Sequence, residues 1–552
     1  MYLKIASLFA IIIISLPVLE VYGDLESTIM ACDEINMPVA PNGKSCIFPP
    51  EIVPTTISDG YIVERLYGGL EFPTTLDFVG DDILVLEKHS GKVIRIQDMG
   101  NQIVVHNQPV LDVSVRYNFY SGMLGIATTS DHVFLYYTES ESGVDTLEVY
   151  GKEEGQHAKN RVYQYDWDGE MLVNPVLVKE FIAQQNNDHH GGVMTTGLNN
   201  EVYFAIGDQG QSGVFENRAD DPCYMIDFVN TSCSSEPIYE TSSIFKIDTE
   251  NDNNVELFAM GIRNSFGLGV DPVTGYLWDT ENGLNYYDEI NLVMPWFNSG
   301  WNHVMGPVDS DNPDTGGAQA IPPQFENFVY SDPELSWYET VGPTAVAIPD
   351  KNGFGIFSDW LFVADYHYGT IYKFQLNSDR TGFDFSDPNV TDLVIFDRII
   401  DASDEEIKTG AVYFHLHEDN LFARTFAGIS DIAFHDNKMY VVSIMDGTLY
   451  RITPITAEII IPDWIKNNAE WWATEQIDDA AYVTSLQWLI SNKIINIPSS
   501  VQTSESSQSQ EIPDWIKNNA GWWATDQIDD ATYVSSLQWL ISNKIINIPS
   551  SV

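Results

Sequence analysis

Four polar segments carry the side chains best suited to chemistry, and each lies between apolar runs. They read NDHHGG at Asn187–Gly192, GDQG at Gly207–Gly210, GIRNSFG at Gly261–Gly267, and ENGLN at Glu281–Asn285 followed by DEINL at Asp288–Leu292. An imidazole is the usual general base near neutral pH, provided that another group fixes its tautomer. The residue types and their order predict that His189 is such a base and that Asp208 orients it.

The remaining segments indicate anion and cation binding. Arg263 supplies a planar cation suited to a carboxylate or an oxyanion. The stretch from Asn282 to Glu289 is rich in oxygen donors, as a Ca²⁺ loop is, although it lacks EF-hand spacing. Glycines beside His189 would leave room for a substrate to approach closely. An alternative stays open, because a histidine among glycines and a Gly-Asp-x-Gly sequence are also ordinary turn features.

The elements that must position these segments repeat along the chain. A unit of apolar strand, turn, second strand and third strand recurs six times, in copies that begin at Leu76, Leu124, Val193, Phe266, Thr344 and Ile429. Each unit leaves an apolar face that only a neighbouring unit can cover. The sequence therefore predicts an all-β fold, a six-bladed β-propeller over residues 61–453, rather than a β-sandwich, which needs no such repetition. The upper loops of a propeller crowd around its central channel, so the polar segments should meet there.

The first residues predict export. Lys4 is followed by an apolar run from Ile5 to Leu19 and then by small side chains before Asp24, so residues 1–23 are expected to be a signal peptide. The apolar run is shorter than the ~20 residues that a membrane-spanning helix needs. We therefore expect a secreted protein, located outside the cell or at the cell surface.

Cysteine content and charge narrow the possible partners. Four cysteines in an exported chain predict two local disulfides, Cys32–Cys46 within an N-terminal extension of residues 24–60 and Cys223–Cys233 within a loop. The chain has 26 basic and 80 acidic residues, which gives a formal net charge of −54. Such a field repels polyphosphate and argues against nucleic acid as a partner.

The tail of the chain is a separate region. Residues 461–501 and 512–552 are near-copies, joined by a linker at residues 502–511 that is rich in Ser and Gln. In the first copy, Pro462 and Asp463 precede apolar residues at helical spacing, which predicts a small helical hairpin in each copy. We expect the paired tryptophans of the copies to pack in their cores; a docking surface for a cell-surface partner is the alternative. These tryptophans are Trp471, Trp472, Trp522 and Trp523.

The motifs DHHGG, IGDQG, GIRNSFG and ENGLNYYDEINL, with NSGWN after them, resemble those of the soluble PQQ-dependent glucose and aldose sugar dehydrogenases. The likeness extends from about Gly69 to Ile452 and includes the order of the motifs along the repeats. It implies a calcium- and PQQ-dependent enzyme that oxidises the anomeric hydroxyl of an aldose to the lactone and passes electrons to an external acceptor. The quinone supplies the redox chemistry, while the protein orients and polarises it.

The resemblance implies roles for residues of the catalytic and cofactor sites. His189 matches the general base that takes the proton of the anomeric hydroxyl, and Asp208 matches its supporting carboxylate. Arg263 and Asn264 match residues that contact the cofactor and its reacting oxygen. Asn282 stands at the place of a Gln that contacts the cofactor in the glucose enzymes.

The resemblance also implies metal ligands. The backbone carbonyls of Gly283 and Leu284 match the ligands of the calcium ion that polarises the quinone as a Lewis acid. Asp288 and Glu289 match positions that bind a second calcium ion in some members.

Several positions differ from the family pattern. Where active members begin the last blade with Arg-x-Arg-Asp, a pair that clamps the carboxylates of the cofactor, this chain reads GISD at Gly428–Asp431. His367 replaces a Lys and Tyr120 replaces a Gln, and both stay expected cofactor contacts. Arg424, a few residues upstream, is the candidate replacement for the missing pair. The alternatives are a non-catalytic propeller that binds a glycan or a protein at the cell surface, and lactone hydrolysis at a propeller calcium.

Overall fold

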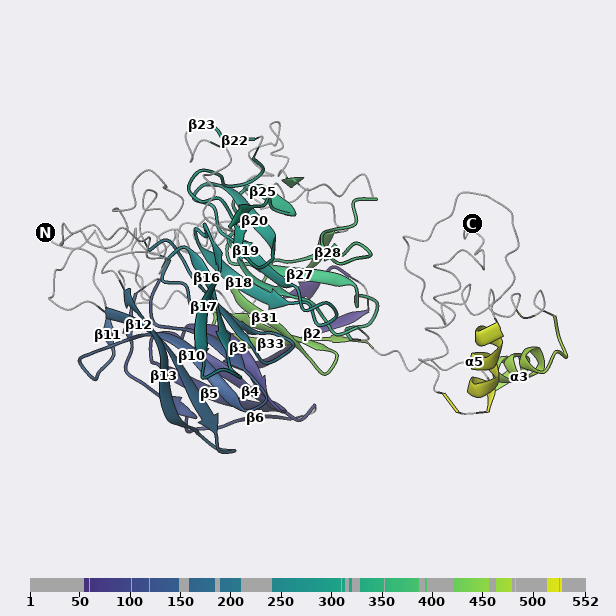
Figure 1. Cartoon of the computed structure of the whole chain (residues 1–552). Helices are drawn as coiled ribbons and strands as arrows, with labels where there is room; N and C mark the ends of the chain where they lie inside the picture. Colours follow the sequence, from purple (N-terminus) through teal and green to yellow (C-terminus); the bar gives the residue numbers. More distant parts are fainter. Residues whose placement is uncertain are drawn as a thin grey trace, which may run out of the picture. The chain divides into compact units, whose positions relative to one another are not determined.

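A computed structural model shows two compact units, residues 1–454 and residues 455–552 (Figure 1). The residues that it describes are 54–58, 60–100, 102–118, 120–147, 158–183, 189–209, 241–308, 310–312, 317–319, 328–351, 353–386, 393–394, 420–455, 463–478, 482, 514–525 and 527–528. The predicted signal peptide and the four cysteines of the predicted disulfides lie outside these residues.

Unit 1 consists of mainly antiparallel sheets, and each predicted strand unit lies in a different sheet. The first predicted unit forms β3 (Pro73–Val79), β4 (Asp82–Glu87), β5 (Lys92–Asp98), β6 (Ile103–Val105) and β7 (Leu111–Asp112). The second forms β9 (Met123–Thr128), β10 (His132–Glu139), β12 (Ala158–Trp167) and β13 (Leu172–Ala183). Short strands β8 (Arg116–Tyr117) and β11 (Thr146–Leu147) pair beside them.

The sheets of the third and fourth units contain the predicted chemical motifs. The third contains β14 (Met194–Thr196), β15 (Val202–Ile206), β16 (Ser243–Asp248), β17 (Asn254–Met260), β21 (Phe297–Asn298) and β24 (Val329–Tyr330). The fourth contains β18 (Ser265–Val270), β19 (Leu277–Glu281), β20 (Tyr286–Val293), β25 (Leu335–Glu339) and β29 (Leu393–Val394). A small hairpin pairs β22 (Asp311–Asn312) with β23 (Gly317–Ala318).

The last two sheets recruit strands from the start of the described chain. The fifth contains β26 (Pro343–Ala347), β27 (Trp360–Asp365), β28 (Ile371–Gln375), β30 (Leu421–Arg424) and β1 (Thr55–Thr56). The sixth contains β31 (Ile429–His435), β32 (Lys438–Ser443), β33 (Thr448–Pro454) and β2 (Tyr61–Gly68). Because β2 pairs with β33, a ladder of backbone hydrogen bonds joins a strand near the start of the described chain to the last strand of unit 1.

The innermost strands hold the sheets around a common centre. They contact each other in the cyclic order β3, β9, β14, β18, β26, β31 and back to β3. Apolar side chains fill the space between neighbouring sheets; for example, Leu84 and Val93 of the first sheet pack with Ile126 and Leu135 of the second. Burying one such side chain contributes about 1.5–3 kcal/mol. The all-β prediction is confirmed, and the sheets have the arrangement of a β-propeller.

Unit 2 is described at one helix of each repeat, α3 (Asp463–Ala473) and α5 (Asp514–Ala524), which pack against each other. The amine of Lys466 lies 5.6 Å from the ring centroid of Trp523, and that of Lys517 lies 5.5 Å from the ring centroid of Trp472. Both of these tryptophans are fully buried, whereas the tryptophan before each is exposed. The second helix of each predicted hairpin lies outside the described residues, and neither α3 nor α5 is long and apolar enough to cross a membrane.

Candidate active site

A cavity of about 390 Å³ lies at one end of the inner strands of unit 1. Thr74, Thr344 and Ser430 line it, and each is the second residue of an inner strand: β3, β26 and β31, respectively. The hydroxyl of each donates a hydrogen bond to the backbone carbonyl of the first residue of the next inner strand. These bonds run from Thr74 to Met123 at 3.0 Å, from Thr344 to Ile429 at 2.7 Å and from Ser430 to Pro73 at 3.0 Å. These bonds fasten neighbouring sheets together at the wall of the cavity.

His189 and Asp208, the predicted base and its orienting carboxylate, form a buried pair at this cavity. Nδ1 of His189 lies 2.7 Å from Oδ1 of Asp208, and Oδ2 of Asp208 accepts a hydrogen bond from Nε1 of Trp301 at 2.9 Å. His189 lines the cavity and has a positive φ of 56°, an uncommon conformation that is frequent at functional sites. Because the carboxylate occupies Nδ1, the imidazole keeps Nε2 as its free basic nitrogen.

The glycines after His189 pack closely against neighbouring strands, and Gly191 also lines the cavity. A Cβ atom on Gly191 would lie 2.4 Å from the carbonyl oxygen of Ala205 in β15. A Cβ atom on Gly192 would lie 2.5 Å from Cβ of Leu124 in β9. Because they have no side chain, these glycines let the loop that carries His189 lie close to the neighbouring strands.

Arg263 is buried behind the wall of the cavity. Its guanidinium donates to the carbonyl of Asn282 and, at 3.0 Å, to that of Gly283, and it lies 5.4 Å from the ring centroid of Trp301. Asn264 and Asn282 line the cavity themselves, and the backbone N–H of Asn282 donates to the carbonyl of Asn264 at 2.9 Å. Arg263 therefore contacts both the indole that supports Asp208 and the loop that was predicted to bind calcium.

The structure places the predicted metal ligands around that loop but not on the cavity wall. Neither Gly283 nor Leu284 lines the cavity, and the carbonyl of Gly283 accepts the guanidinium of Arg263. Asp288 is buried and accepts backbone N–H groups of Gly283, Val341 and Gly342 at 2.6–2.8 Å, so it holds the loop to the wall. Burial raises the pKa of Asp288 to about 6.

Glu289 belongs to a group of buried acidic side chains. Glu289 was predicted as a metal ligand, but its neighbours Asp279 and Glu281 were not. Asp279 and Glu281 on β19 lie opposite Asn291 and Glu289 on β20, so all four project from one side of the hairpin. Burial raises the pKa of Glu281 to about 7. Burial also raises the pKa values of Asp279 and Glu289 well above the usual range, and repulsion from the charge of Glu281 raises them further. The signal in the sequence is a pair of alternating acidic residues in the apolar run LWDTE.

The two substituted cofactor contacts reach the cavity, whereas the candidate replacement for the arginine pair does not. Tyr120 and His367 both line it, and the ring of Tyr120 meets that of His189 edge to face, with 6.2 Å between centroids. Arg424 does not line it, because this residue is exposed at the end of the outer strand β30, opposite Thr55 of the edge strand β1. The structure therefore does not place Arg424 where it could replace the arginine pair.

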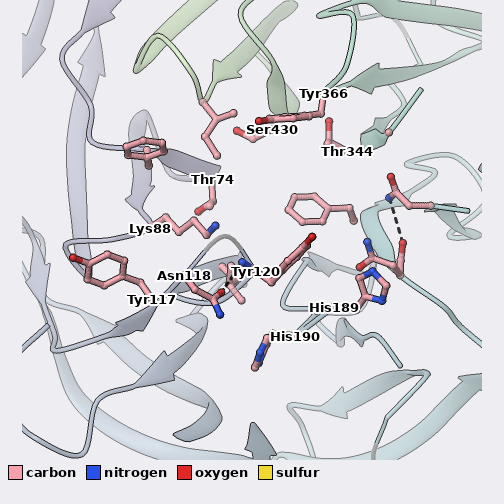
Figure 2. Close-up of a pocket in the computed structure, with 18 of the residues that line it drawn as sticks. Thr74, Lys88, Tyr117, Asn118, Tyr120, His189, His190, Thr344, Tyr366 and Ser430 are labelled. Atoms are coloured by element: carbon pink, nitrogen blue, oxygen red, sulfur yellow. Dashed lines mark hydrogen bonds between the residues drawn. The ribbon is translucent and has the colours of Figure 1, made fainter. Parts of the chain in front are cut away.

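The lining of the cavity is basic and aromatic, although the chain as a whole is strongly acidic. Among the described residues that line it, none is Asp or Glu, and Figure 2 shows Lys88 and His189 on opposite sides. Lys88 and His89 were not predicted; their signal is a Lys-His pair directly after the apolar strand LVLE. Burial lowers the pKa of Lys88 to about 7 and that of His89 to about 3. The basic lining residues are Lys88, His89, His189, His190 and His367.

These features define a class of protein: a β-propeller whose cavity suits an anionic aromatic ligand and holds a histidine oriented by a carboxylate. The family of glucose/sorbosone dehydrogenases matches residues 70–414, which is more than half of the chain. The chain belongs to this family.

Two relatives show the extent of the likeness in sequence. The chain is 25% identical over 304 residues to the uncharacterised protein slr1608 of Synechocystis sp., covering 51% of this chain and 67% of that protein. It is 26% identical over 283 residues to quinoprotein glucose dehydrogenase B of Acinetobacter calcoaceticus, covering 48% of this chain and 56% of that protein. The chain thus spans a little over half the length of the second relative.

Two solved structures are similar to part of this chain. The PQQ-bound form of aldose sugar dehydrogenase from Streptomyces coelicolor is 17% identical, with a TM-score of 0.45, 71% of this chain covered and 98% of that chain covered. The apo form of the soluble aldose sugar dehydrogenase from Escherichia coli is 16% identical, with a TM-score of 0.47 and coverages of 71% and 99%.

Proposed function

We propose that this chain is a secreted, PQQ- and calcium-dependent sugar dehydrogenase that oxidises the anomeric hydroxyl of an aldose to the lactone. One observation carries the proposal: the buried pair of His189 and Asp208 stands at a cavity whose described lining is basic and aromatic. Membership of the glucose/sorbosone dehydrogenase family supports a sugar as the substrate, and the quinoprotein relative supports PQQ as the cofactor. An external acceptor then takes the electrons.

The cavity fits PQQ in size and in charge. Its volume of about 390 Å³ lies within the range of about 300–1,000 Å³ of small-molecule sites. PQQ is a planar tricarboxylate, which suits aromatic walls without acidic side chains. Tyr120, Asn264, Asn282 and His367 would contact it, with Arg263 acting from behind the wall. When bound, the quinone accepts the hydride of the sugar and so supplies the redox chemistry.

His189 moves the proton in this proposal. Its Nε2 takes the proton of the anomeric hydroxyl, because Nδ1 is held by Asp208. The carboxylate of Asp208 stabilises the imidazolium that forms, and the indole N–H of Trp301 keeps that carboxylate in its orientation. A positioned general base of this kind contributes about 10²–10⁴-fold to the rate.

Calcium has two proposed positions. The carbonyls of Gly283 and Leu284 are of the ligand type that Ca²⁺ takes, but a cation there must displace the guanidinium of Arg263 from Gly283. The buried group around Glu289 fits a cation by a separate observation. Oδ2 of Asp279 and Oδ1 of Asn291 are buried without a hydrogen-bond partner, and a divalent cation would satisfy both.

The finer architecture belongs to the same proposal. We infer six blades, because the innermost strands of six sheets contact each other in a closed cycle. Secretion rests on the predicted signal peptide at residues 1–23, and the two predicted disulfides suit an exported chain. The tail repeats are proposed to meet a cell-surface partner, and the exposed indoles of Trp471 and Trp522 support that role.

Reconstitution tests the proposal. The purified full-length protein, stripped of metal with EDTA, is titrated with PQQ with and without added calcium, and the aldose-dependent reduction of a dye is then followed. We expect tight binding of PQQ that requires calcium, and dye reduction that the His189→Ala variant lacks while it still binds PQQ. A folded, calcium-loaded protein that binds no PQQ would contradict the proposal and favour a non-catalytic propeller that binds a glycan or a protein.

A further inference from the structure

The cavity has no cationic side chain at the start of the last sheet, where the family pattern has an arginine pair. At that place the chain has Gly428, Ser430 and the apolar Ile429 between them, and Arg424 lies elsewhere. No arginine lines the cavity among the described residues, and Lys88 is the single lysine of the lining. Lys88 comes from the first sheet, directly after β4, and not from the last.

Lys88 nevertheless lies beside the position of the missing pair. Its backbone N–H donates to the carbonyl of Phe72 at 3.1 Å, and the hydroxyl of Ser430 donates to the carbonyl of Pro73 at 3.0 Å. Phe72 and Pro73 are consecutive, so one peptide segment joins Lys88 to the start of β31. Figure 2 shows Lys88 reaching into the cavity from the side opposite His189. A ligand between the two would meet the base at one end and the amine at the other.

The backbone holds Lys88 closely in this place. Its carbonyl accepts the N–H of Met123 at 3.0 Å. Gly122 packs under the side chain: a Cβ atom there would lie 2.4 Å from the carbonyl oxygen of Lys88 and 2.9 Å from its Cγ. Lys88 is 7% exposed, so its ammonium is largely removed from water. A carboxylate beside that ammonium would favour its charged form.

We propose that Lys88 binds a carboxylate of PQQ and takes the place of the missing arginine pair. This inference rests on the proposed function. A hydrogen bond between an ammonium and a carboxylate is about twice as strong as a neutral one, and a buried pair is screened little by salt. Lys88 then acts as a cofactor-binding residue that sets which end of the quinone faces His189.

The test is the affinity of the calcium-loaded, full-length protein for PQQ, measured by calorimetric titration. We expect Lys88→Met to weaken binding about 10- to 100-fold, the range of one charge-assisted hydrogen bond, and Lys88→Arg to retain most of the affinity. Lys373→Met is a matched control, because Lys373 is also 7% exposed but lies over the rings of Phe357 and Trp360 and does not line the cavity. It should bind PQQ as the unmodified protein does.

The trimethyl ester of PQQ separates charge from shape. Without carboxylates to pair with Lys88, the ester should bind the unmodified protein and Lys88→Met equally. Thermal unfolding checks that the variant is folded, and Lys88→Gln serves as a second neutral variant. Equal PQQ affinities of both neutral variants and the unmodified protein would overturn this inference and leave the dehydrogenase proposal intact. Failure of the unmodified protein to bind PQQ would instead contradict the proposed function, and the inference with it.

Discussion

Nδ1 of His189 lies 2.7 Å from Oδ1 of Asp208, and both side chains are buried. The pair joins the loop before β14 to the residues after β15, so the sheet itself sets its geometry. The other carboxylate oxygen is bonded to Trp301, which follows β21. Three separate segments thus fix the orientation of one imidazole, which is the preorganisation that general base catalysis needs.

His189 and its neighbour His190 allow a direct test of the base. Both line the cavity, but Nδ1 of His190 lies 3.1 Å from the amide nitrogen of Asn160, whereas Nδ1 of His189 contacts Asp208. We expect His189→Ala to lower kcat about 10²–10⁴-fold with little change in PQQ affinity. His190→Ala should lower the thermal stability and change kcat much less. Steady-state kinetics at saturating PQQ decide the matter, and equal losses of kcat in both variants would contradict the assignment.

Asp208 is expected to act through the tautomer of His189. Asp208→Asn keeps the shape but removes the charge that stabilises the imidazolium, so kcat should fall about 10²-fold or more. Trp301→Phe keeps the carboxylate and removes one hydrogen bond to it, so its loss of kcat should be smaller. Both variants should bind PQQ. A larger loss of kcat in Trp301→Phe than in Asp208→Asn would show that packing, rather than charge, supports the base.

Arg263 should be irreplaceable by lysine. Its guanidinium bonds two successive carbonyls and lies over Trp301, and an ammonium cannot match that planar fork. Arg263→Lys is expected to lower kcat/KM at least about tenfold, the effect of one charge-assisted hydrogen bond. Arg451→Lys is the matched control, since Arg451 is similarly buried but pairs with Asp98 and Glu64. Arg451→Lys should lower Tm without changing kcat/KM of the folded protein. Equal losses of kcat/KM in the two variants would contradict the proposed role of Arg263.

Substitution of two fully buried aspartates should change the stability in opposite directions at pH 8. Burial and repulsion from Glu281 raise the pKa of Asp279, whereas hydrogen bonds from Arg380 outweigh burial and lower the pKa of Asp271. A raised pKa means that folding stability falls as pH rises above the unfolded value near 4, so Asp279→Asn should stabilise the metal-free protein more at pH 8 than at pH 5. Asp271→Asn breaks a buried pair and should destabilise it by about 3–5 kcal/mol at pH 8.

Urea unfolding in EDTA at both pH values measures these free energies. Added calcium should reverse the sign for Asp279→Asn if the cation binds at the acidic group, because the unmodified carboxylate then gains a partner. If Asp279→Asn and Asp271→Asn destabilised the protein equally, with no effect of pH, the raised pKa of Asp279 and the lowered pKa of Asp271 would be contradicted.

The strands and the pair of His189 and Asp208 were accessible to prediction because their signals are local. Alternating apolar residues bounded by turns specify a strand wherever one face is buried, so each predicted repeat corresponds to a sheet. His189 and Asp208 lie in short motifs whose order along the chain was itself informative. The two residues are 19 positions apart in the sequence, and they come into contact because both loops lie at the same end of neighbouring strands.

Other features depend on which strand is inner and which is outer, and the sequence does not state this. Arg424 is near the last sheet in sequence, but β30 is an outer strand, so it does not reach the cavity. Lys88 and Asp279 resemble surface residues because charged side chains are seldom buried. Only the packing of neighbouring sheets shows that both are enclosed. The strands that pack against the glycines after His189 are likewise distant from them in sequence.

One measurement tests the central claim most directly. The full-length protein is loaded with calcium and one equivalent of PQQ, mixed anaerobically with an aldose, and followed by absorbance in a stopped-flow instrument. We predict a single-turnover change from oxidised to reduced quinone, slowed by deuterium at C1 of the sugar and about 10²–10⁴-fold slower in His189→Ala. Bound PQQ that stays oxidised in the presence of every aldose tried would contradict the assignment of this chain as a sugar dehydrogenase.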